Sequence, residues 1–310
     1  MIIQGMTYPL NGVSALPHLG VIRVEGEEAA KFLQGQLTQD FVLLGPSQAR
    51  LAAFCTAKGR MQASFVGFQR APNEILLVCS RDILAPTLKR LSMFVLRARA
   101  KLIDATDQFA LFGLAGDALE ALPAELKEPW AKADVGAAQA VALYPADGQR
   151  RVLWVVPVDQ PAPAGATLAT PLWLWGEVRS GIATITAPIV EAFVPQMLNY
   201  ESVGGVNFKK GCYPGQEVVA RSQFRGTLKR RAFLAHCDTE LAAGQEVFHE
   251  SDPEQACGTV AQAAPAPSGG WDAIVSMQLS AAAQGRLTLG GSAGPELRLL
   301  PLPYLLLADV

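Results

Sequence analysis

The hydrophobic pattern of the chain changes character near residue 227, and this change limits the architectures that the chain can adopt. Before that point, apolar residues at helical spacing alternate with strand-like runs, which predicts an α+β region over residues 1–226. After it, short strand-like runs are separated by Gly, Pro and Ser without a convincing helix, so residues 227–310 are expected to form a small all-β domain, a barrel or a sandwich. A chain of 310 residues usually contains two or three domains, in agreement with this division.

Within the α+β region, one pattern occurs twice. A strand over 19–24 leads through a Gly and two Glu residues into a helix whose apolar face runs from Ala29 to Leu37. A strand over 109–115 leads through Gly116-Asp117 into a helix that continues to Leu122. Further strands are expected over 49–57, 60–68 and 75–79, with a helix over 82–94 and a hairpin that turns at 146–148. Because strand–turn–helix units are common, the pattern by itself leaves open whether the region consists of two related halves.

Composition and charge exclude several classes of protein. Half of the residues are hydrophobic and 17% are charged, as in folded globular proteins. A net charge of −2 does not favour non-specific binding to nucleic acid, which needs a strongly positive face, so no direct nucleic-acid binding is expected. The first ten residues lack the pattern of a signal peptide, and no apolar run reaches the ~20 residues that a membrane-spanning helix needs. We therefore expect a soluble protein without membrane contact.

The cysteines indicate a reduced, cytoplasmic protein. There are five, widely spaced and without a CxxC pair, which favours neither a disulfide framework nor a zinc site. Four have apolar or strand-like neighbours and are expected to be buried, namely Cys55, Cys79, Cys237 and Cys257. Only Cys212 has polar and charged neighbours. The three histidines are scattered along the chain, so no metal site is predicted.

The segment KKGCYPGQEVVAR, residues 209–221, carries the strongest local signal. Pro214-Gly215 predicts a tight turn with a positive φ at Gly215, followed by a helix that starts near Gln216. Cys212 precedes that helix and follows two lysines, and both surroundings favour a thiolate. This predicts an exposed, reactive thiol. The alternatives are that Cys212 packs under the turn, that the lysines are merely solvated, and that Pro-Gly is only a turn.

Basic residues gather around the same segment. Residues 209–231 contain seven of them and a single acidic residue, Glu217. The seven are Lys209, Lys210, Arg221, Arg225, Lys229, Arg230 and Arg231. If they surround one cleft, their potential attracts a polyanion, whereas a solvated charged face is the alternative.

Residues 210–217, KGCYPGQE, match the motif K-G-C-[FY]-x-G-Q-E, and the chain therefore resembles the YgfZ family of folate-binding proteins. Segments 24–40, 55–61, 194–211 and 301–304 are also similar to that family, so the likeness extends over essentially the whole chain. The family resembles the T-protein of the glycine cleavage system, an aminomethyltransferase that uses tetrahydrofolate. The resemblance implies two related α+β halves around a central folate cleft, closed by a C-terminal β-barrel. It also implies a role in the assembly or repair of iron–sulfur enzymes and, indirectly, in tRNA modification, with iron–sulfur proteins as possible partners.

The resemblance also assigns residues to the site. It implies that tetrahydrofolate or a derivative binds in the cleft, with Trp173 as a folate-lining residue, although a merely buried aromatic ring is the alternative there. Cys212 and Lys210 are expected to form the functional edge, and Gly211, Pro214 and Gly215 to shape the motif backbone. Further folate-binding residues are expected in the motif and the helix after it, namely Tyr213, Gln216, Glu217 and Arg221.

Three positions, Ala63, Ser64 and Arg179, depart from the pattern of the aminomethyltransferases, and one, Leu19, departs from that of the YgfZ family. Ala63 and Ser64 stand where those enzymes have an Asp-Asp pair that supplies the catalytic carboxylate, so enzymatic activity is left open. Arg179 stands where they hold the pterin with a Glu, so pterin recognition is expected to differ. A second folate-lining tryptophan of the YgfZ family falls near Leu19. Two other functions therefore stay open: a folate-dependent one-carbon transferase, and a protein-docking module that binds no folate.

Overall fold

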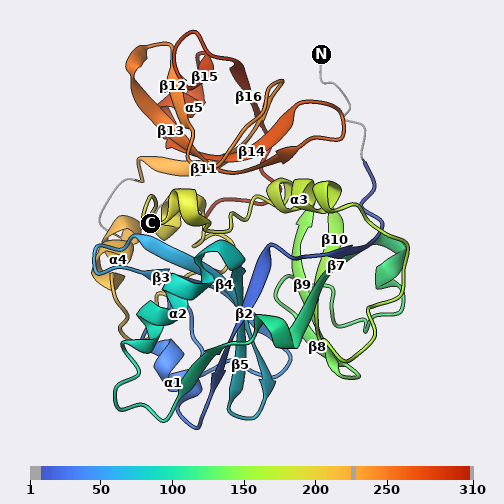
Figure 1. Ribbon diagram of the computed structural model, residues 1–310. Helices are drawn as coiled ribbons and strands as arrows, with labels where there is room; N and C mark the ends of the chain where they lie inside the picture. The colour runs from blue at the N-terminus through green and yellow to red at the C-terminus, as the bar shows by residue number, and fades with distance from the viewer. Residues whose placement is uncertain (1–7, 225–227, 308–310) are drawn as a thin grey trace.

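The computed structural model describes residues 8–224 and 228–307, which form two five-stranded antiparallel sheets and a closed barrel (Figure 1). The first sheet has the order β3-β4-β5-β2-β6. Its strands are β2 (Leu19–Glu25), β3 (Ala49–Cys55), β4 (Met61–Ala71), β5 (Glu74–Ser80) and β6 (Lys101–Asp104). The helices of this half are α1 (Ala29–Gln34), the short 3-10 helix η1 (Arg81–Ile83) and α2 (Leu84–Ser92).

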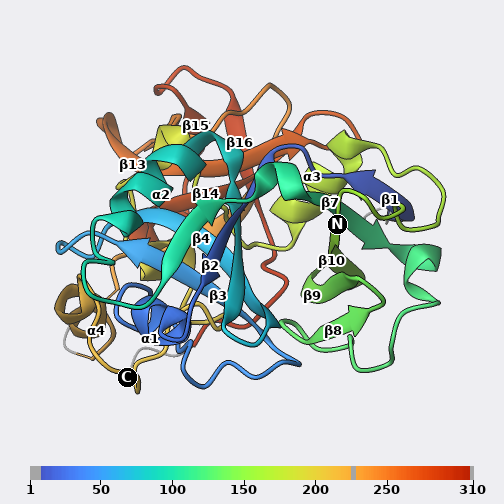
Figure 2. The same ribbon diagram turned by 60° about the horizontal axis from the view of Figure 1, so that its bottom comes forward.

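The second sheet has the order β1-β7-β10-β9-β8. Its strands are β1 (Gly12–Ala15), β7 (Phe109–Ala115), β8 (Lys132–Val135), β9 (Ala138–Ala146) and β10 (Gln149–Pro157). With them come the 3-10 helices η2 (Thr106–Gln108) and η3 (Gly116–Leu119) and the helix α3 (Thr170–Arg179). In Figure 2 the two sheets lie side by side, with the first sheet on the left and the second on the right.

The two halves share one strand order and exchange one strand. Strands β2, β3, β4 and β5 of the first half occupy the same places as β7, β8, β9 and β10 of the second. The fifth strand of each sheet comes from the part of the chain next to the other half. Strand β1 precedes β2 in the chain but pairs with β7. Strand β6 precedes β7 in the chain but pairs with β2. This topology confirms two related α+β halves. It also ties the halves together, because each sheet includes an edge strand that is adjacent in sequence to the other half.

One expected helix of the second half is much shorter than predicted. The segment that follows β7 forms only the 3-10 helix η3, which ends at Leu119. Gly116 has a φ of +60° and packs against the side chain of Asn11. Pro123 then disfavours helical geometry at Leu122, the residue before it. The equivalent segment of the first half carries no proline and forms α1.

The C-terminal part is a closed barrel of six strands in the order β11-β14-β13-β12-β15-β16. The strands are β11 (Arg230–Cys237), β12 (Glu246–His249), β13 (Asp252–Pro265), β14 (Trp271–Gln278), β15 (Leu287–Leu289) and β16 (Glu296–Leu300). The expectation of no helix is wrong at one place, where α5 (Leu279–Ala283) follows β14. The expected boundary between residues 226 and 227 lies outside the described residues, as does Arg225.

The segment between α3 and the barrel contains η4 (Ala187–Ile189), η5 (Pro195–Leu198) and α4 (Gln216–Phe224). Asn199 joins it to the barrel, because its amide donates to the carbonyl of Ala232 at 2.9 Å and accepts from the amide of the same residue at 3.2 Å. Ser276 of β14 donates to the carbonyl of Met197 at 2.8 Å. In Figure 1 the barrel lies above both sheets, and α4 lies at the left, beside β3. Within residues 8–224 and 228–307, no helix combines the length and the apolar character needed to cross a membrane.

Candidate functional site

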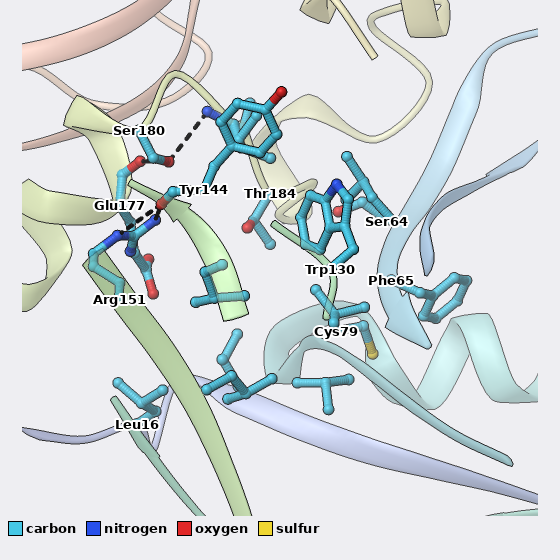
Figure 3. Close-up of a pocket in the computed structure, with 18 of the residues that line it drawn as sticks. Leu16, Ser64, Phe65, Cys79, Trp130, Tyr144, Arg151, Glu177, Ser180 and Thr184 are labelled. Carbon is cyan, nitrogen blue, oxygen red and sulfur yellow. Dashed lines mark hydrogen bonds between the residues drawn. The ribbon is translucent and has the colours of Figure 1, made fainter. Parts of the chain in front are cut away.

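A mainly apolar cavity lies between the two sheets and next to α3 (Figure 3). Both halves contribute to its wall, with Leu19 and Ser64 from the first sheet and Leu153 from the second. Five aromatic residues also line it: Phe65, Trp130, Tyr144, Trp173 and Tyr200. A cavity at this place is the central cleft that the resemblance implies, and it also contains the position of Leu19, where the YgfZ family has a second tryptophan.

Glu177 of α3 is the one carboxylate in the described lining of this cavity. Its Oε1 accepts from the indole N–H of Trp173 at 2.9 Å and lies 3.2 Å from Nε2 of His18, while Oε2 accepts from Gln262 at 3.3 Å. Burial alone would raise the pKa of this carboxyl, but the hydrogen bond and charge of His18, with help from Arg151 and Trp173, hold it below its usual value. Glu177 is therefore an ionised and well-oriented group at neutral pH.

Arg151 of β10 is the one cation in the described lining. Its side chain is buried, and its guanidinium lies 5.1 Å from the centre of the Trp173 ring, a cation–π contact. Nε and Nη2 both donate to the carbonyl oxygen of Tyr144, at 3.3 and 3.0 Å. Burial lowers the pKa of Arg151 to about 10, which leaves the group charged at neutral pH. In Figure 3, Arg151, Glu177 and Tyr144 lie on one side of the cavity, opposite Trp130.

Trp173 both lines the cavity and is fully buried, with 0% of its surface exposed. The ring lies on β7 at Gly113, where an added Cβ would lie 2.4 Å from the indole carbon Cε2. Only a glycine leaves room for the ring at this point. The backbone of β7 and the guanidinium of Arg151 therefore both lie against the Trp173 ring.

The structure shows where Arg179 lies, and the expected difference in pterin recognition stays a prediction. The Arg179 side chain does not line the cavity; it forms a bidentate ion pair with Asp147, at 2.7–3.0 Å, and a longer contact with Asp272. The acidic group at the cavity is Glu177, two residues earlier in the same helix. Sequence reasoning missed this because the motif alignment pointed to position 179, whereas helical geometry turns position 177 inward.

The positions of the expected carboxylate pair are neutral. Ala63 is buried in β4, and Ser64 lines the cavity with its hydroxyl accepting from the amide of Ile185 at 2.9 Å. Neither side chain can act as a general base or stabilise a cation in the way an aspartate does. The cavity therefore lacks the carboxylate pair of the aminomethyltransferases.

The Pro-Gly turn of the motif packs against the β3–β4 hairpin. Gly215 has a φ of +81°, as the Pro-Gly pattern predicts, and α4 begins at the next residue. A Cβ on Gly215 would lie 2.4 Å from the carbonyl oxygen of Thr56 and 2.7 Å from the Cα of Gly59. Two segments that are similar to the YgfZ family, 55–61 and 210–217, thus meet backbone to backbone.

Lys210 points inward, so the alternative of a merely solvated lysine is wrong for this residue. Its Nζ donates to the carbonyl oxygen of Leu37 at 2.6 Å and to that of Gln34 at the end of α1. The ammonium also lies 4.5 Å from the centre of the Tyr213 ring. Burial lowers the pKa of Lys210 to about 8, although Asp40 and Cys212 act in the opposite direction. Lys210 therefore fixes the motif to the segment after α1.

Cys212 is exposed, and the other four cysteines are buried, as the sequence predicts. The alternative that Cys212 packs under the turn is therefore excluded. Burial raises the pKa of both Cys55 and Cys79 to about 12. Cys79 lines the cavity, and Cys55 lies within electrostatic range of Tyr200 in the cavity wall and of Tyr213 in the motif.

The KGCYPGQE motif and the cavity are thus neighbours, but no residue of the motif belongs to the described lining of the cavity. Of the predicted folate-binding residues, Trp173 lines the cavity, and four do not: Tyr213, Gln216, Glu217 and Arg221. Tyr213 is buried and Gln216 is half-buried, while Glu217 and Arg221 are exposed. The folate contacts of these four residues stay a prediction. Sequence reasoning did not single out Arg151, Trp130, Tyr144 and Tyr200; the first three lie in no motif, and Tyr200 lies in segment 194–211, which is similar to the YgfZ family.

The basic segment 209–231 is only partly a charged surface. Lys209, Arg221 and Lys229 are exposed. Lys210 and Arg231 are buried, and Arg231 forms an ion pair with Glu201 at 2.5 Å. A solvated charged face is therefore excluded for these two residues, and the attraction of a polyanion to the segment stays a prediction.

The arrangement of two halves, a barrel and a cavity between the halves defines the class of protein. The structure of the glycine cleavage system aminomethyltransferase T from Bartonella henselae superimposes with a TM-score of 0.65, covering 94% of this chain and 86% of that one. At 16% identity, this likeness establishes the aminomethyltransferase T fold and nothing more.

Sequence relatives make the assignment more specific. The tRNA-modifying protein YgfZ of Edwardsiella ictaluri is 33% identical over 306 residues, which cover 91% of this chain and 89% of that protein. The proteins of the same name from Klebsiella pneumoniae and Yersinia enterocolitica are 31% and 29% identical, over 91% and 97% of this chain. No protein-family model matches the chain. The chain belongs to the YgfZ family.

Proposed function

We propose that this protein binds tetrahydrofolate or a derivative in the cavity between the two halves. The observation that carries the proposal is a buried, mainly apolar cavity with one carboxylate, Glu177, and one guanidinium, Arg151, on the same side. A pterin combines a flat ring with hydrogen-bond donors and acceptors at its edge, and aromatic walls with a few fixed polar groups suit such a ligand. The motif residues Tyr213, Gln216, Glu217 and Arg221 are assigned to the outer part of the ligand.

The proposed cellular role is to support the assembly or repair of iron–sulfur enzymes in the cytoplasm and, through them, tRNA modification. The relatives are named tRNA-modifying proteins, and the five unpaired cysteines suit a reducing compartment. Cys212 is the exposed nucleophile of the motif, and we assign it, with Lys210, to the functional edge. Iron–sulfur proteins are the proposed partners, and neither direct nucleic-acid binding nor membrane binding is proposed.

A one-carbon transferase is the less favoured function, because Ala63 and Ser64 provide no carboxylate. An aminomethyl-transfer assay with tetrahydrofolate as acceptor distinguishes the two functions. Turnover by the wild-type protein would establish the transferase, and binding without turnover supports the proposal.

Folate binding itself is tested by titrating tetrahydrofolate under anaerobic conditions while recording heat and tryptophan fluorescence. We expect saturable heat and quenching of Trp173 and Trp130, which both line the cavity. Trp173→Phe keeps an aromatic ring and should reduce the quenching, with a loss in affinity of about 0.5–1.5 kcal/mol. Trp154→Phe is the matched control, because Trp154 does not line the cavity. A wild-type protein that gives neither heat nor quenching refutes folate binding and favours a docking module.

A further inference from the structure

Arg151 is a buried cation whose hydrogen-bonding capacity is largely unused. Its exposed fraction is 3%, and the only acceptor that it has among the described residues is the carbonyl oxygen of Tyr144. A guanidinium has five N–H donors, and here two atoms, Nε and Nη2, share that single oxygen. Nη1 has no hydrogen-bond partner in the part of the chain that the structure describes. Buried polar groups are nearly always paired, so an unpaired donor on a buried cation calls for an explanation.

The neighbouring carboxylate does not fill this capacity. Glu177 attracts Arg151 electrostatically, but its two oxygens are occupied by Trp173, His18 and Gln262. The two groups therefore stand at the same cavity as a separate donor and a separate acceptor. A buried guanidinium without a direct carboxylate partner costs stability, so its position in the cavity wall needs an explanation other than stability.

The surroundings of Arg151 hold its guanidinium in a fixed orientation. The Tyr144 carbonyl accepts hydrogen bonds from Nε and Nη2, and the guanidinium carbon lies 5.1 Å from the centre of the Trp173 ring. Trp173 is in turn held against Gly113, where no side chain would fit. A polar group that is oriented before the ligand arrives loses little entropy on binding, which favours recognition.

We propose that Arg151 is the specificity residue of the cavity and donates hydrogen bonds to an oxygen of the bound folate. This inference rests on the proposed folate binding and deepens it. Two oxygens have the required chemistry: the 4-oxo group of the pterin ring and a carboxylate of the glutamate tail. Charge-assisted hydrogen bonds from a guanidinium in a water-poor site are among the strongest that side chains form.

The test compares three ligands that differ in one group. Folic acid has both oxygens, aminopterin replaces the 4-oxo group by an amino group, and pteroic acid lacks the glutamate. Each is titrated against the wild-type protein, Arg151→Met and Arg151→Lys. The control is Arg150→Met, which removes a neighbouring guanidinium that is exposed and outside this cavity.

We expect Arg151→Met to weaken the binding of folic acid about 10- to 100-fold, and Arg150→Met to leave it unchanged. Arg151→Lys should recover part of the affinity, because it keeps the charge without the planar fork. If Arg151 binds the 4-oxo group, the wild-type protein prefers folic acid to aminopterin and Arg151→Met loses that preference. If it binds the carboxylate, the preference that disappears is the one over pteroic acid.

The preference between two ligands is measured within one variant, so a partial loss of folded protein does not mimic the effect. If Arg151→Met is insoluble, Arg151→Lys gives the same comparison. Equal affinities for wild type and Arg151 variants, with both preferences retained, overturn the role of Arg151 and leave folate binding intact. A wild-type protein that binds none of the three ligands, and gives no heat with tetrahydrofolate either, overturns both proposals.

Discussion

Gly215 of the KGCYPGQE motif and Gly59 of the β3–β4 hairpin meet backbone to backbone, so that a Cβ on Gly215 would lie 2.7 Å from the Cα of Gly59. The φ of Gly215 is +81°, a region that other residues rarely adopt. Both facts require glycine at position 215 for structural reasons. The Pro214-Gly215 turn is therefore a contact point between two segments of the fold.

The close contact between Gly215 and Gly59 predicts that one added methyl group at position 215 lowers the stability of the fold. Gly215→Ala should lower the free energy of unfolding by about 1–3 kcal/mol, because the methyl group meets the backbone of the hairpin and φ is unfavourable. Gly211→Ala is the matched control, since nothing lies within 4 Å of an added Cβ there. Urea unfolding of the two variants provides the measurement, and equal stabilities would contradict the prediction.

Lys210 should contribute to stability even though it lies in the motif. Lys210→Met leaves the carbonyls of Gln34 and Leu37 without their donor, and we expect a loss of about 1–3 kcal/mol. Lys209→Met, which replaces the exposed neighbour, should change stability by less than about 0.5 kcal/mol. The denaturant midpoints of the two variants, compared with that of the wild type, test this prediction. If Lys210→Met unfolds like the wild type, the buried contacts of the ammonium do not stabilise the fold.

Two buried thiols predict a loss of stability in alkali. The pKa of Cys55 and of Cys79 is raised by burial to about 12, while in the unfolded chain a thiol ionises near its usual value of ~8.5. The unfolded state therefore releases protons that the folded state keeps, and the free energy of unfolding falls as pH rises through this window. Each thiol contributes a slope of about 1.4 kcal/mol per pH unit between roughly pH 9 and 12.

Lys210 acts with the opposite sign, because its pKa of about 8 lies below its usual value. The unfolded chain keeps this proton above pH 8, so stability rises with pH over the lysine's window. The comparison that isolates the thiols is between the wild type and Cys55→Ala or Cys79→Ala, with urea unfolding at pH 8, 9 and 10. Each variant should show a less steep loss than the wild type. Parallel pH profiles would mean that the thiols do not titrate on unfolding.

Local patterns predicted most of the fold. The strands near 19–24, 49–57, 60–68 and 75–79, the helical α4 after Pro214-Gly215 and the all-β C-terminal part follow from periodicity and turn chemistry, which are local properties. The exchange of β1 and β6 between the halves was not predictable in this way. Strand pairing depends on contacts between residues about 100 positions apart, as between Gly12 and Ala115, and no short pattern encodes them.

The candidate site was less predictable for the same reason. The motif identified Cys212 and the turn, and the resemblance identified Trp173 at the cavity. Arg151 was not singled out, because an arginine inside a strand is usually a surface residue, and only the structure shows that Trp173 of α3 packs against it. The inward turn of Lys210 could not be read from the sequence either, since its partners are backbone carbonyls, which have no sequence signature.

The exposed position of Cys212 predicts selective chemistry. Iodoacetamide should modify Cys212 first in the folded protein, whereas the four buried cysteines should react only after unfolding. Mass-spectrometric mapping over time, with and without denaturant, measures this order.

Because Cys212 is exposed, Cys212→Ser should change the free energy of unfolding by less than about 0.5 kcal/mol. The same variant should fail to restore the activity of iron–sulfur enzymes in cells that lack the protein, and Cys237→Ser, at a buried thiol of the barrel, is the control. Full restoration by Cys212→Ser would show that the thiol is dispensable and that the motif acts through its backbone contact alone.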